Sequence, residues 1–215
     1  MKNTVGKDPE SKRPRLAVLA SGSGTDFQSI VDAVEAGGLN AALPLLICNV
    51  PGAGVLTRAK RHCVKAVLLP HEGLGRDEYD ARLHDALVEH DIDLVALAGF
   101  MRMLSPGFVE KWKYRLVNIH PALLPSFPGV HAHRDAISYG VKVSGLTIHF
   151  VDEQMDHGPI IFQKAVEVRD DDTESTLGAR VLEQEHIWYP KVLQWIAEGR
   201  VRVEGRRVHI SGGRD

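Results

Sequence analysis

The chain has 215 residues, of which 44% are hydrophobic and 25% are charged, and its formal net charge at pH 7 is −2. This composition is average for a globular protein and allows one α/β domain of ordinary size. A net charge this close to zero excludes a broad basic surface for nucleic acid, but it is compatible with a local site for a small anion. No run of eighteen apolar residues could span a membrane, and residues 1–14 lack the apolar core of a signal peptide, so we expect a cytoplasmic protein.

The first half of the chain has the pattern of a parallel sheet. Residues 1–14 offer little apolar surface, and we expect them to form a disordered extension before a single domain over residues 15–215. Five short apolar runs, each typical of a strand buried on both faces, then span residues 16–20, 43–48, 66–69, 94–98 and 116–119. They alternate with amphipathic segments that predict helices, most clearly at 26–36 and 77–90. This alternation predicts an α/β fold with a mostly parallel, twisted, Rossmann-like sheet and helices on both faces.

The second half is richer in β-type patterns. Residues 141–152 and 159–168 predict two strands that extend the sheet or pair beside it. A long helix is predicted over residues 173–199, with an interruption near Pro190 and with acidic residues 170–172 solvated at its start, where carboxylates complement the helix dipole. Residues 201–210 predict a small C-terminal hairpin.

The first predicted strand leads directly into a glycine-rich turn with the sequence SGSGTDF, residues 21–27. Glycines let the backbone approach a ligand, and the free N–H groups of the following helix can bind an anion, so the turn predicts a phosphate site. A plain tight turn is the alternative interpretation. A dinucleotide loop would need a third glycine at Phe27 and an acidic residue near Asn49; both are missing, so a single phosphate fits better than a pyrophosphate.

A polar cluster is predicted at the end of the fifth apolar run. Asn118 and His120 are two positions apart, so they share one face of the strand at the edge where parallel sheets bind ligands. An amide beside an imidazole can hold a developing oxyanion, although a hydrogen-bonded pair that closes the strand is the alternative. Asp156 precedes a Gly-Pro corner and could face the same cleft, where a carboxylate favours a charged imidazole and relays protons; otherwise it is a turn former.

Cysteine and histidine usage gives no sign of a metal site. Cys48 and Cys63 are too few for a disulfide framework or a cysteine zinc site, and we expect both to be reduced and buried or half-buried. His131 and His133 form an isolated His-x-His pattern, which is weak evidence for a metal ligand pair. We therefore expect no required metal.

Taken together, these segments resemble the glycinamide ribonucleotide transformylase family, the folate-dependent branch of the formyl transferases. The resemblance runs from Arg15 to about Gly199. The matching stretches are SGSGTDFQSI (21–30), LAGFMRMLSP (97–106), NIHPALLPSFPG (118–129), GLTIHFVDEQMDHGPI (145–160) and QEHIWYP (184–190). The combination is highly specific, whereas none of its parts is specific alone.

The resemblance implies a role for each residue at a functional position of the family. The implied catalytic residues are His120, Asn118 and Asp156. The implied contacts to the ribonucleotide come from Gly24, Thr25 and Asp26 around the phosphate and from Glu185 at the ribose. The implied folate contacts come from Arg76, Met101, Arg102, Met103, Leu104 and Asn118.

Three of these positions need comment. Asp26 replaces the asparagine that is more usual in the family, and its carboxylate would repel a phosphate unless it turned away to cap the helix. Glu185 lies on the apolar stripe of the last predicted helix, where a buried charge needs either a structural partner or a ligand. His157 follows the implied catalytic aspartate at a position that is often small in the family, and no role is assigned to it.

The reaction implied by the resemblance is transfer of the formyl group of 10-formyltetrahydrofolate to the amine of 5′-phosphoribosylglycinamide in purine (IMP) synthesis. The amine would attack directly, protonated His120 and Asn118 would hold the oxyanion of a tetrahedral intermediate, and Asp156 would assist proton transfer. Formyl-folate is then a co-substrate. The expected partners are small-molecule substrates, with no nucleic acid or membrane, and the protein would be a monomer or homodimer.

Three alternatives stay open at this point. A 10-formyltetrahydrofolate hydrolase could use the same trio with water as acceptor, but an additional N-terminal regulatory domain would be expected. A methionyl-tRNA formyltransferase would be expected to have a C-terminal RNA-binding domain and a more basic surface. A non-catalytic nucleotide- or folate-binding module would not need an oxyanion site.

Overall fold

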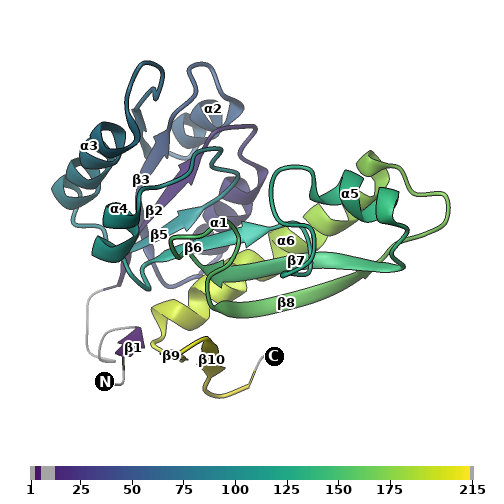
Figure 1. Ribbon diagram of the computed structural model, residues 1–215. Helices are drawn as coiled ribbons and strands as arrows, with labels where there is room; N and C mark the ends of the chain where they lie inside the picture. Colours follow the sequence, from purple (N-terminus) through teal and green to yellow (C-terminus); the bar gives the residue numbers. More distant parts are fainter. Residues whose placement is uncertain (1–2, 6–12, 214–215) are drawn as a thin grey trace.

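A seven-stranded sheet runs through the centre of the computed structural model, which describes residues 3–5 and 13–213 (Figure 1). The strand order is β4-β3-β2-β5-β6-β7-β8; the first five strands are parallel, and β7 and β8 are antiparallel to their neighbours. The strands are β2 Arg15–Ala20, β3 Ala42–Cys48, β4 Lys65–Leu68, β5 Leu94–Leu97, β6 Leu116–His120, β7 Val143–Phe150 and β8 Ile160–Glu167. The predicted mostly parallel sheet is confirmed, and the two later strands extend it.

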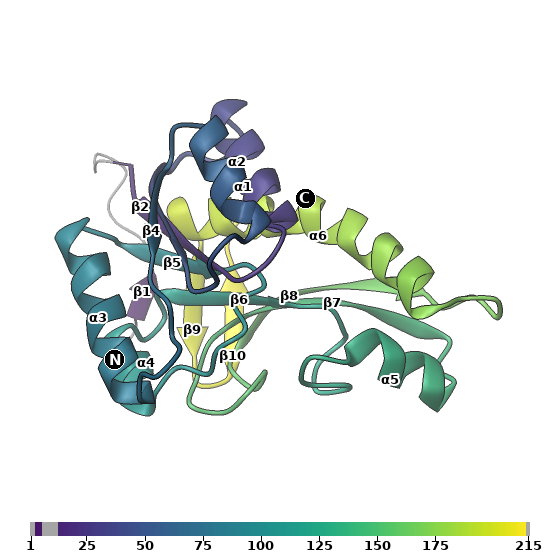
Figure 2. The ribbon, with the colours of Figure 1, turned by 90° about the horizontal axis from the view of Figure 1, so that it is seen from above.

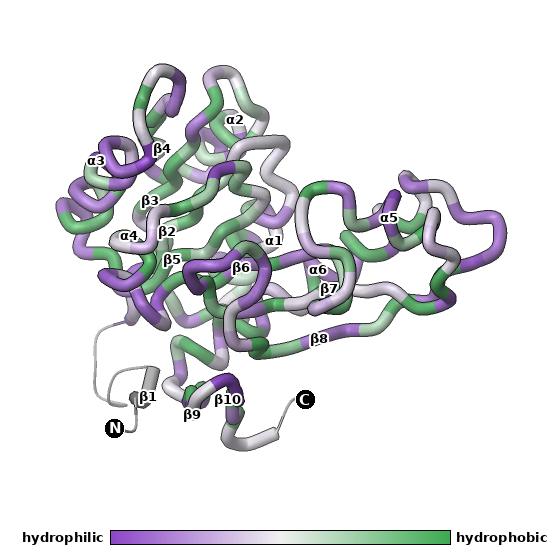
Figure 3. Tube along the Cα trace, viewed as in Figure 1, coloured by the Kyte–Doolittle hydropathy of each residue, from purple (hydrophilic) through white to green (hydrophobic). Residues whose placement is uncertain are grey.

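Helices cover both faces of this sheet, as predicted. They are α1 Thr25–Glu35, α2 Gly54–Arg61, α3 Arg76–Glu89, α4 Pro106–Lys111, α5 Ala132–Tyr139 and α6 Glu174–Ala197. Buried residues of α1, α2 and α6 form one apolar layer with the sheet, and those of α3 and α4 form the other (Figure 2). β2 serves both layers, since Leu16 and Val18 face the first and Ala17 and Leu19 face the second. Apolar residues are accordingly concentrated in the central strands in Figure 3.

Some local predictions were wrong. β4 is not buried on both faces, because it lies at the edge of the sheet with one neighbouring strand. α6 is not interrupted at Pro190, because packing of its apolar face on the sheet holds the helix together despite the missing N–H group. Cys63 is exposed, in contrast to Cys48. The acidic run is not uniformly solvated, since the side chain of Asp172 is largely buried and paired with Arg180.

The C-terminal hairpin is confirmed as β9 Val201–Glu204 and β10 Arg207–Ile210. β1, residues Asn3–Val5, pairs with β9 in antiparallel orientation. The edge of β9 offers backbone hydrogen-bonding groups that a strand of any composition can pair with, which composition alone does not reveal. The disorder predicted for residues 1–14 stays a prediction. Residues 1–2 and 6–12 of this extension lie outside the described residues. Within the described part of the chain, no helix has the length and apolar composition needed to cross a bilayer.

Tyr189 connects α6 to the strand ends that carry the polar cluster. The side chain is fully buried, and its hydroxyl lies 2.9 Å from the carbonyl oxygens of both Leu97 and Val117. These carbonyls lie at the end of β5 and next to Asn118 in β6. The hydroxyl proton is shared between them, and the helix is thereby fixed to the ligand-facing edge of the sheet.

We expect Tyr189→Phe to lower the free energy of unfolding by about 1–3 kcal/mol, because two buried carbonyls lose their shared donor without loss of ring packing. Urea denaturation measures the change. Tyr139→Phe is the matched control, since Tyr139 is 80% exposed and its loss of a hydroxyl should leave stability unchanged. Equal stability of Tyr189→Phe and the unmodified protein would contradict this account.

Candidate active site

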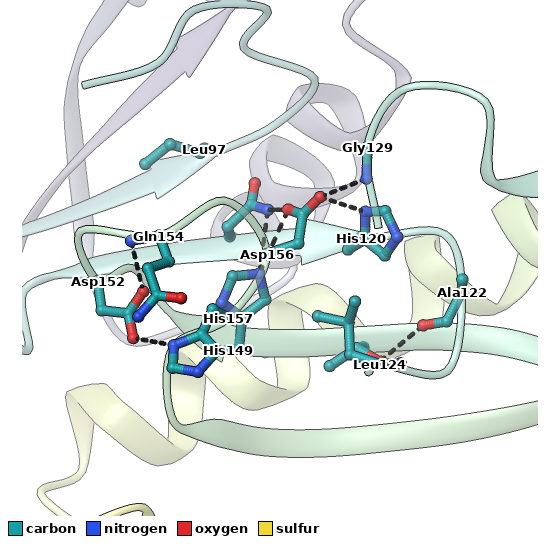
Figure 4. Close-up of polar contacts among 12 residues, drawn as sticks. Leu97, His120, Ala122, Leu124, Gly129, His149, Asp152, Gln154, Asp156 and His157 are labelled. Carbon is teal, nitrogen blue, oxygen red and sulfur yellow. Dashed lines mark hydrogen bonds and ion pairs between the residues drawn. The ribbon is translucent and has the colours of Figure 1, made fainter. Parts of the chain in front are cut away.

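Asn118, His120 and Asp156 line one pocket, at the carboxyl ends of β5 and β6. Figure 4 shows the His120 ring and the Asp156 carboxylate turned toward each other. The pocket has a volume of about 250 Å³. The Nδ1 atom of His120 lies 3.4 Å from Oδ2 of Asp156, and Nδ2 of Asn118 lies 3.5 Å from Oδ1 of the same carboxylate. The structure therefore brings together the three residues that the sequence analysis singled out, from two separate segments of the chain.

His149 sets the orientation of the Asn118 amide. It lies directly opposite Asn118 in the antiparallel pairing of β7 with β6, and it is 2% exposed. Its Nδ1 is 2.9 Å from the carbonyl oxygen of Phe150, which can only accept, so Nδ1 carries a proton. Burial lowers the pKa of His149 and keeps the ring neutral, with the nearby Asp156 acting in the opposite direction. Nε2 is therefore unprotonated, and it accepts a hydrogen bond from Nδ2 of Asn118 at 3.2 Å.

His120 is held from the other side of its ring. Its Nε2 donates to the carbonyl oxygen of Phe127 at 2.8 Å, which leaves Nδ1 facing Asp156. The Asp156 carboxylate is itself fixed, because the backbone N–H of Gly129 donates to Oδ2 at 2.8 Å. Ring and carboxylate therefore have defined positions before any ligand binds.

The mouth of the pocket is apolar, in contrast to this polar end. Met101, Met103, Val130 and Met155 line it and are all exposed to solvent. A pocket with an apolar entrance and a few convergent polar groups suits an organic ligand with a flat apolar body and one reactive polar group.

Ser21 and Arg102 fix the loop between β5 and α4 that forms one wall. The Ser21 hydroxyl accepts from the backbone N–H of Met101 at 2.8 Å and donates to Oδ1 of Asn49 at 2.6 Å. The guanidinium of Arg102 lies 4.4 Å from the ring centre of Tyr79, and its Nη2 reaches the carbonyl oxygens of residues 74 and 75. The sequence analysis missed Ser21 and Asn49, whose only signal was a polar residue directly after each of two buried strands.

The residues implied for folate contact are only partly gathered. Met101, Arg102, Met103 and Leu104 all line the pocket, and Leu104 is buried. Arg76 begins α3, is exposed, and is not among the residues that line the pocket.

The glycine-rich turn leads into the N-terminus of α1, as predicted. Gly24 has φ of +75°, and a Cβ there would lie 2.5 Å from the Val55 side chain, so the glycine is required by the packing of α2. Thr25, the first residue of α1, lines a second cavity of about 280 Å³ together with α2 and α6 residues. Arg58 of α2 also lines it and donates to the Ser23 carbonyl at 2.8 Å. This arginine, missed by the sequence analysis, places a positive charge beside the predicted phosphate loop.

Asp26 and Glu185 form a buried carboxyl pair behind this loop. The Asp26 side chain does not cap α1: its Oδ1 is buried without a hydrogen-bond partner and lies 3.8 Å from Nε2 of His186. Glu185 is 7% exposed, and no hydrogen bond joins its side chain to another described residue. Burial, and secondarily the charge of Asp26, raises the pKa of Glu185 to about 8. Burial raises the pKa of Asp26 to about 6.

The pair makes stability depend on pH. The folded protein keeps the Glu185 proton up to a pKa of about 8, whereas an unfolded chain loses it near the ordinary glutamate pKa of 4.5. Between these values the folded state binds more protons, so stability falls as pH rises. We expect Glu185→Gln to be clearly more stable than the unmodified protein at about pH 9 and to lose that advantage near pH 5.

Urea midpoints at the two pH values measure this effect. Glu183→Gln is the matched control, because Glu183 lies on the same helix but is exposed, and its substitution should not alter the pH dependence. A Glu185→Gln advantage of the same size at both pH values would contradict the assignment.

The histidines at 131 and 133 lie at the start of α5. Within residues 3–5 and 13–213, no group of three or more His, Cys, Asp or Glu side chains is arranged to hold a metal ion. The polar end of the pocket gathers an amide donor, an imidazole and a carboxylate.

Comparison with known proteins places the chain in a family. A sequence profile described as formyl transferase matches residues 14–193. The human trifunctional purine biosynthetic protein adenosine-3 is 42% identical over 195 residues, which cover 90% of this chain and 19% of that protein. The chain spans 14–19% of the length of this and similar trifunctional relatives.

Relatives of similar length also match. The phosphoribosylglycinamide formyltransferase of Bacillus subtilis is 39% identical over 181 residues, which cover 84% of this chain and 93% of that protein. The crystal structure of glycinamide ribonucleotide transformylase 1 from Symbiobacterium toebii superposes with a TM-score of 0.91 at 41% identity, covering 95% of this chain and 98% of that one. On these grounds, the chain belongs to the formyl transferase family.

Proposed function

We propose that this protein transfers the formyl group of 10-formyltetrahydrofolate to the amine of 5′-phosphoribosylglycinamide, a step of purine (IMP) synthesis. The observation that carries the proposal is the convergence of Asn118, His120 and Asp156 at the polar end of an apolar-mouthed pocket. Family membership supports it, as do the names of the Bacillus and Symbiobacterium relatives, which this chain covers almost completely.

The pocket fits the formyl donor in shape and chemistry. When bound, 10-formyltetrahydrofolate supplies an activated formyl carbonyl attached to N10. The exposed methionines at positions 101, 103 and 155 provide apolar walls for the flat part of such a molecule, and the formyl group would reach the polar end.

Two contacts at that end are long enough to be replaced by a substrate oxygen. Charge-assisted hydrogen bonds are normally about 2.7–2.9 Å. The His120–Asp156 distance is 3.4 Å and the Asn118–Asp156 distance is 3.5 Å, whereas Asn118 keeps a shorter 3.2 Å contact with His149. One N–H of Asn118 and Nδ1–H of protonated His120 are thus the donors for the oxyanion that forms when the amine attacks the formyl carbon.

Asp156 assists the proton transfers that the reaction requires. As the new N–C bond forms and the C–N10 bond breaks, a proton must leave the amine and another must reach N10. The carboxylate of Asp156, held by Gly129, stabilises the imidazolium form of His120 and assists this movement directly or through water. This mechanism has no covalent acyl-enzyme intermediate.

The acceptor would bind through its phosphate. The backbone N–H groups of Gly24, Thr25 and Asp26, at the start of α1, would donate to this phosphate. Arg58 adds a positive charge beside them. Glu185 would contact the ribose. Protonation of the Asp26–Glu185 pair reduces its repulsion of the phosphate, since the raised pKa values keep a proton on the pair near neutral pH.

The enzyme's substrates are then small molecules, and it acts as a monomer or homodimer. We expect formyl transfer to require the ribonucleotide, with little folate deformylation in its absence. Following 10-formyltetrahydrofolate consumption with and without 5′-phosphoribosylglycinamide measures this directly. Equal consumption in both reactions would instead identify a hydrolase, which uses water as acceptor, and no consumption would indicate a binding module.

We expect His120→Ala and Asp156→Asn each to lower kcat at least about 100-fold, because each removes stabilisation of the oxyanion or of the charge that holds it. Steady-state kinetics gives kcat, and thermal unfolding checks that the fold is intact. Asp171→Asn makes the same chemical change at an exposed site and should be neutral. Near-normal turnover of either pocket variant would refute the catalytic assignment.

A further inference from the structure

The C-terminal hairpin contacts the loop that carries Asp156. Arg206, in the turn between β9 and β10, donates from Nη2 to the carbonyl oxygen of His157 at 2.7 Å. Its Nη1 lies 3.2 Å and 3.3 Å from the two ring nitrogens of the same histidine. The ring Nδ1 in turn lies 2.7 Å from Oδ2 of Asp152 (Figure 4). Asp152, His157 and Arg206 together form what we call the loop clasp.

The clasp acts on a loop whose backbone is already constrained. Asp156 has φ of +51°, a left-handed conformation that is uncommon outside glycine, although aspartate adopts it more readily than most other residues. The loop leaves through Gly158, where a Cβ would lie 1.8 Å from the Phe150 carbonyl oxygen, so the chain passes against β7 itself. At the start of the loop, Oδ1 of Asp152 accepts from the Gln154 N–H at 3.0 Å.

The hydrogen bond from Arg206 restrains His157, the residue next to Asp156. A residue in an unfavourable conformation keeps it only when its surroundings determine it strongly. The Asp156 carboxylate must meet the Gly129 N–H at 2.8 Å and face His120 at 3.4 Å. Rotation of the backbone at residues 156 and 157 would move the carboxylate away from both groups, and the hydrogen bond from Arg206 to the His157 carbonyl, one peptide further along, restrains this part of the loop.

We propose that Arg206 is a positioning residue for Asp156: its hydrogen bond to the His157 carbonyl holds the loop so that the carboxylate stays aligned with His120. The proposal rests on the proposed function for its kinetic consequence. Arg206 lies beyond residue 193, where the match to the family profile ends, whereas His157 lies within the matched segment. It also gives His157 a structural role, since its ring bridges Arg206 and Asp152.

The test compares Arg206→Ala with Arg207→Ala. Both residues are exposed in the same hairpin and both changes remove one positive charge, but no hydrogen bond or ion pair joins the side chain of Arg207 to another described residue. We expect Arg206→Ala to lower kcat about ten-fold, because a small misplacement of a catalytic group is costly. KM for the ribonucleotide should stay within about two-fold, since the phosphate loop is on α1, away from the hairpin. Arg207→Ala should match the unmodified protein.

Two further measurements separate positioning from a general structural effect. Arg206→Lys can still donate to the carbonyl and should recover part of kcat, while all three variants keep the thermal stability of the unmodified protein. Hydrogen exchange should become faster in residues 152–158 of Arg206→Ala and stay unchanged in Arg207→Ala.

The outcomes distinguish this inference from the proposed function. An unmodified protein without formyl transfer activity would overturn the proposed function, while hydrogen exchange would still decide whether Arg206 holds the loop. An active protein in which Arg206→Ala keeps normal kcat and normal exchange would overturn the inference. The inference would equally fail if KM alone rose, or if Arg207→Ala lost as much activity as Arg206→Ala.

Discussion

The site depends on the antiparallel register between β6 and β7. This register places Asn118 opposite His149 and His120 opposite Thr147. A neutral, buried His149 accepts from the Asn118 amide and thereby decides which end of that amide carries its donors into the pocket. Thr147 fixes the loop after β6, since its hydroxyl donates to the Ala122 carbonyl at 2.6 Å and accepts from the Leu124 N–H at 3.0 Å. A slip of β7 by one residue would turn His149 and Thr147 to the other face of the sheet, away from Asn118 and His120.

Around this register, the two ends of the site use different physical means. At the proposed acyl-transfer end, the groups are fixed by hydrogen bonds to backbone: His120 by Phe127 and Asp156 by Gly129. At the proposed phosphate end, the protein buries two carboxyls, Asp26 and Glu185, without giving them hydrogen-bond partners among the described residues. The first arrangement needs no reorganisation when charge develops. The second places a proton-dependent charge next to the proposed anion site, which would link binding there to pH.

Much of this could be predicted from the sequence, for identifiable reasons. Buried parallel strands are continuous apolar runs, and polar residues at their ends, such as Asn118 and His120, mark the ligand edge. The helices α2, α4 and α5 were missed because six to eight residues give too few turns for a clear period. His149 and Arg206 act through pairing partners distant in sequence, and no local pattern reveals such partners. The sequence left the position of the Asp26 carboxylate open, because its burial beside Glu185 depends on helix α6, far along the chain.

The central claim is that a neutral His149, protonated at Nδ1, holds the Asn118 amide with its N–H groups toward the site. Nitrogen NMR of protein labelled at histidine observes the tautomer and charge of each ring directly. The account predicts that His149 shows a protonated Nδ1 and a bare Nε2 at neutral pH, and that it stays neutral on mild acidification while exposed histidines become charged. A His149 ring protonated at Nε2, or an imidazolium at neutral pH, would contradict it, because Nε2 could then no longer accept from Asn118.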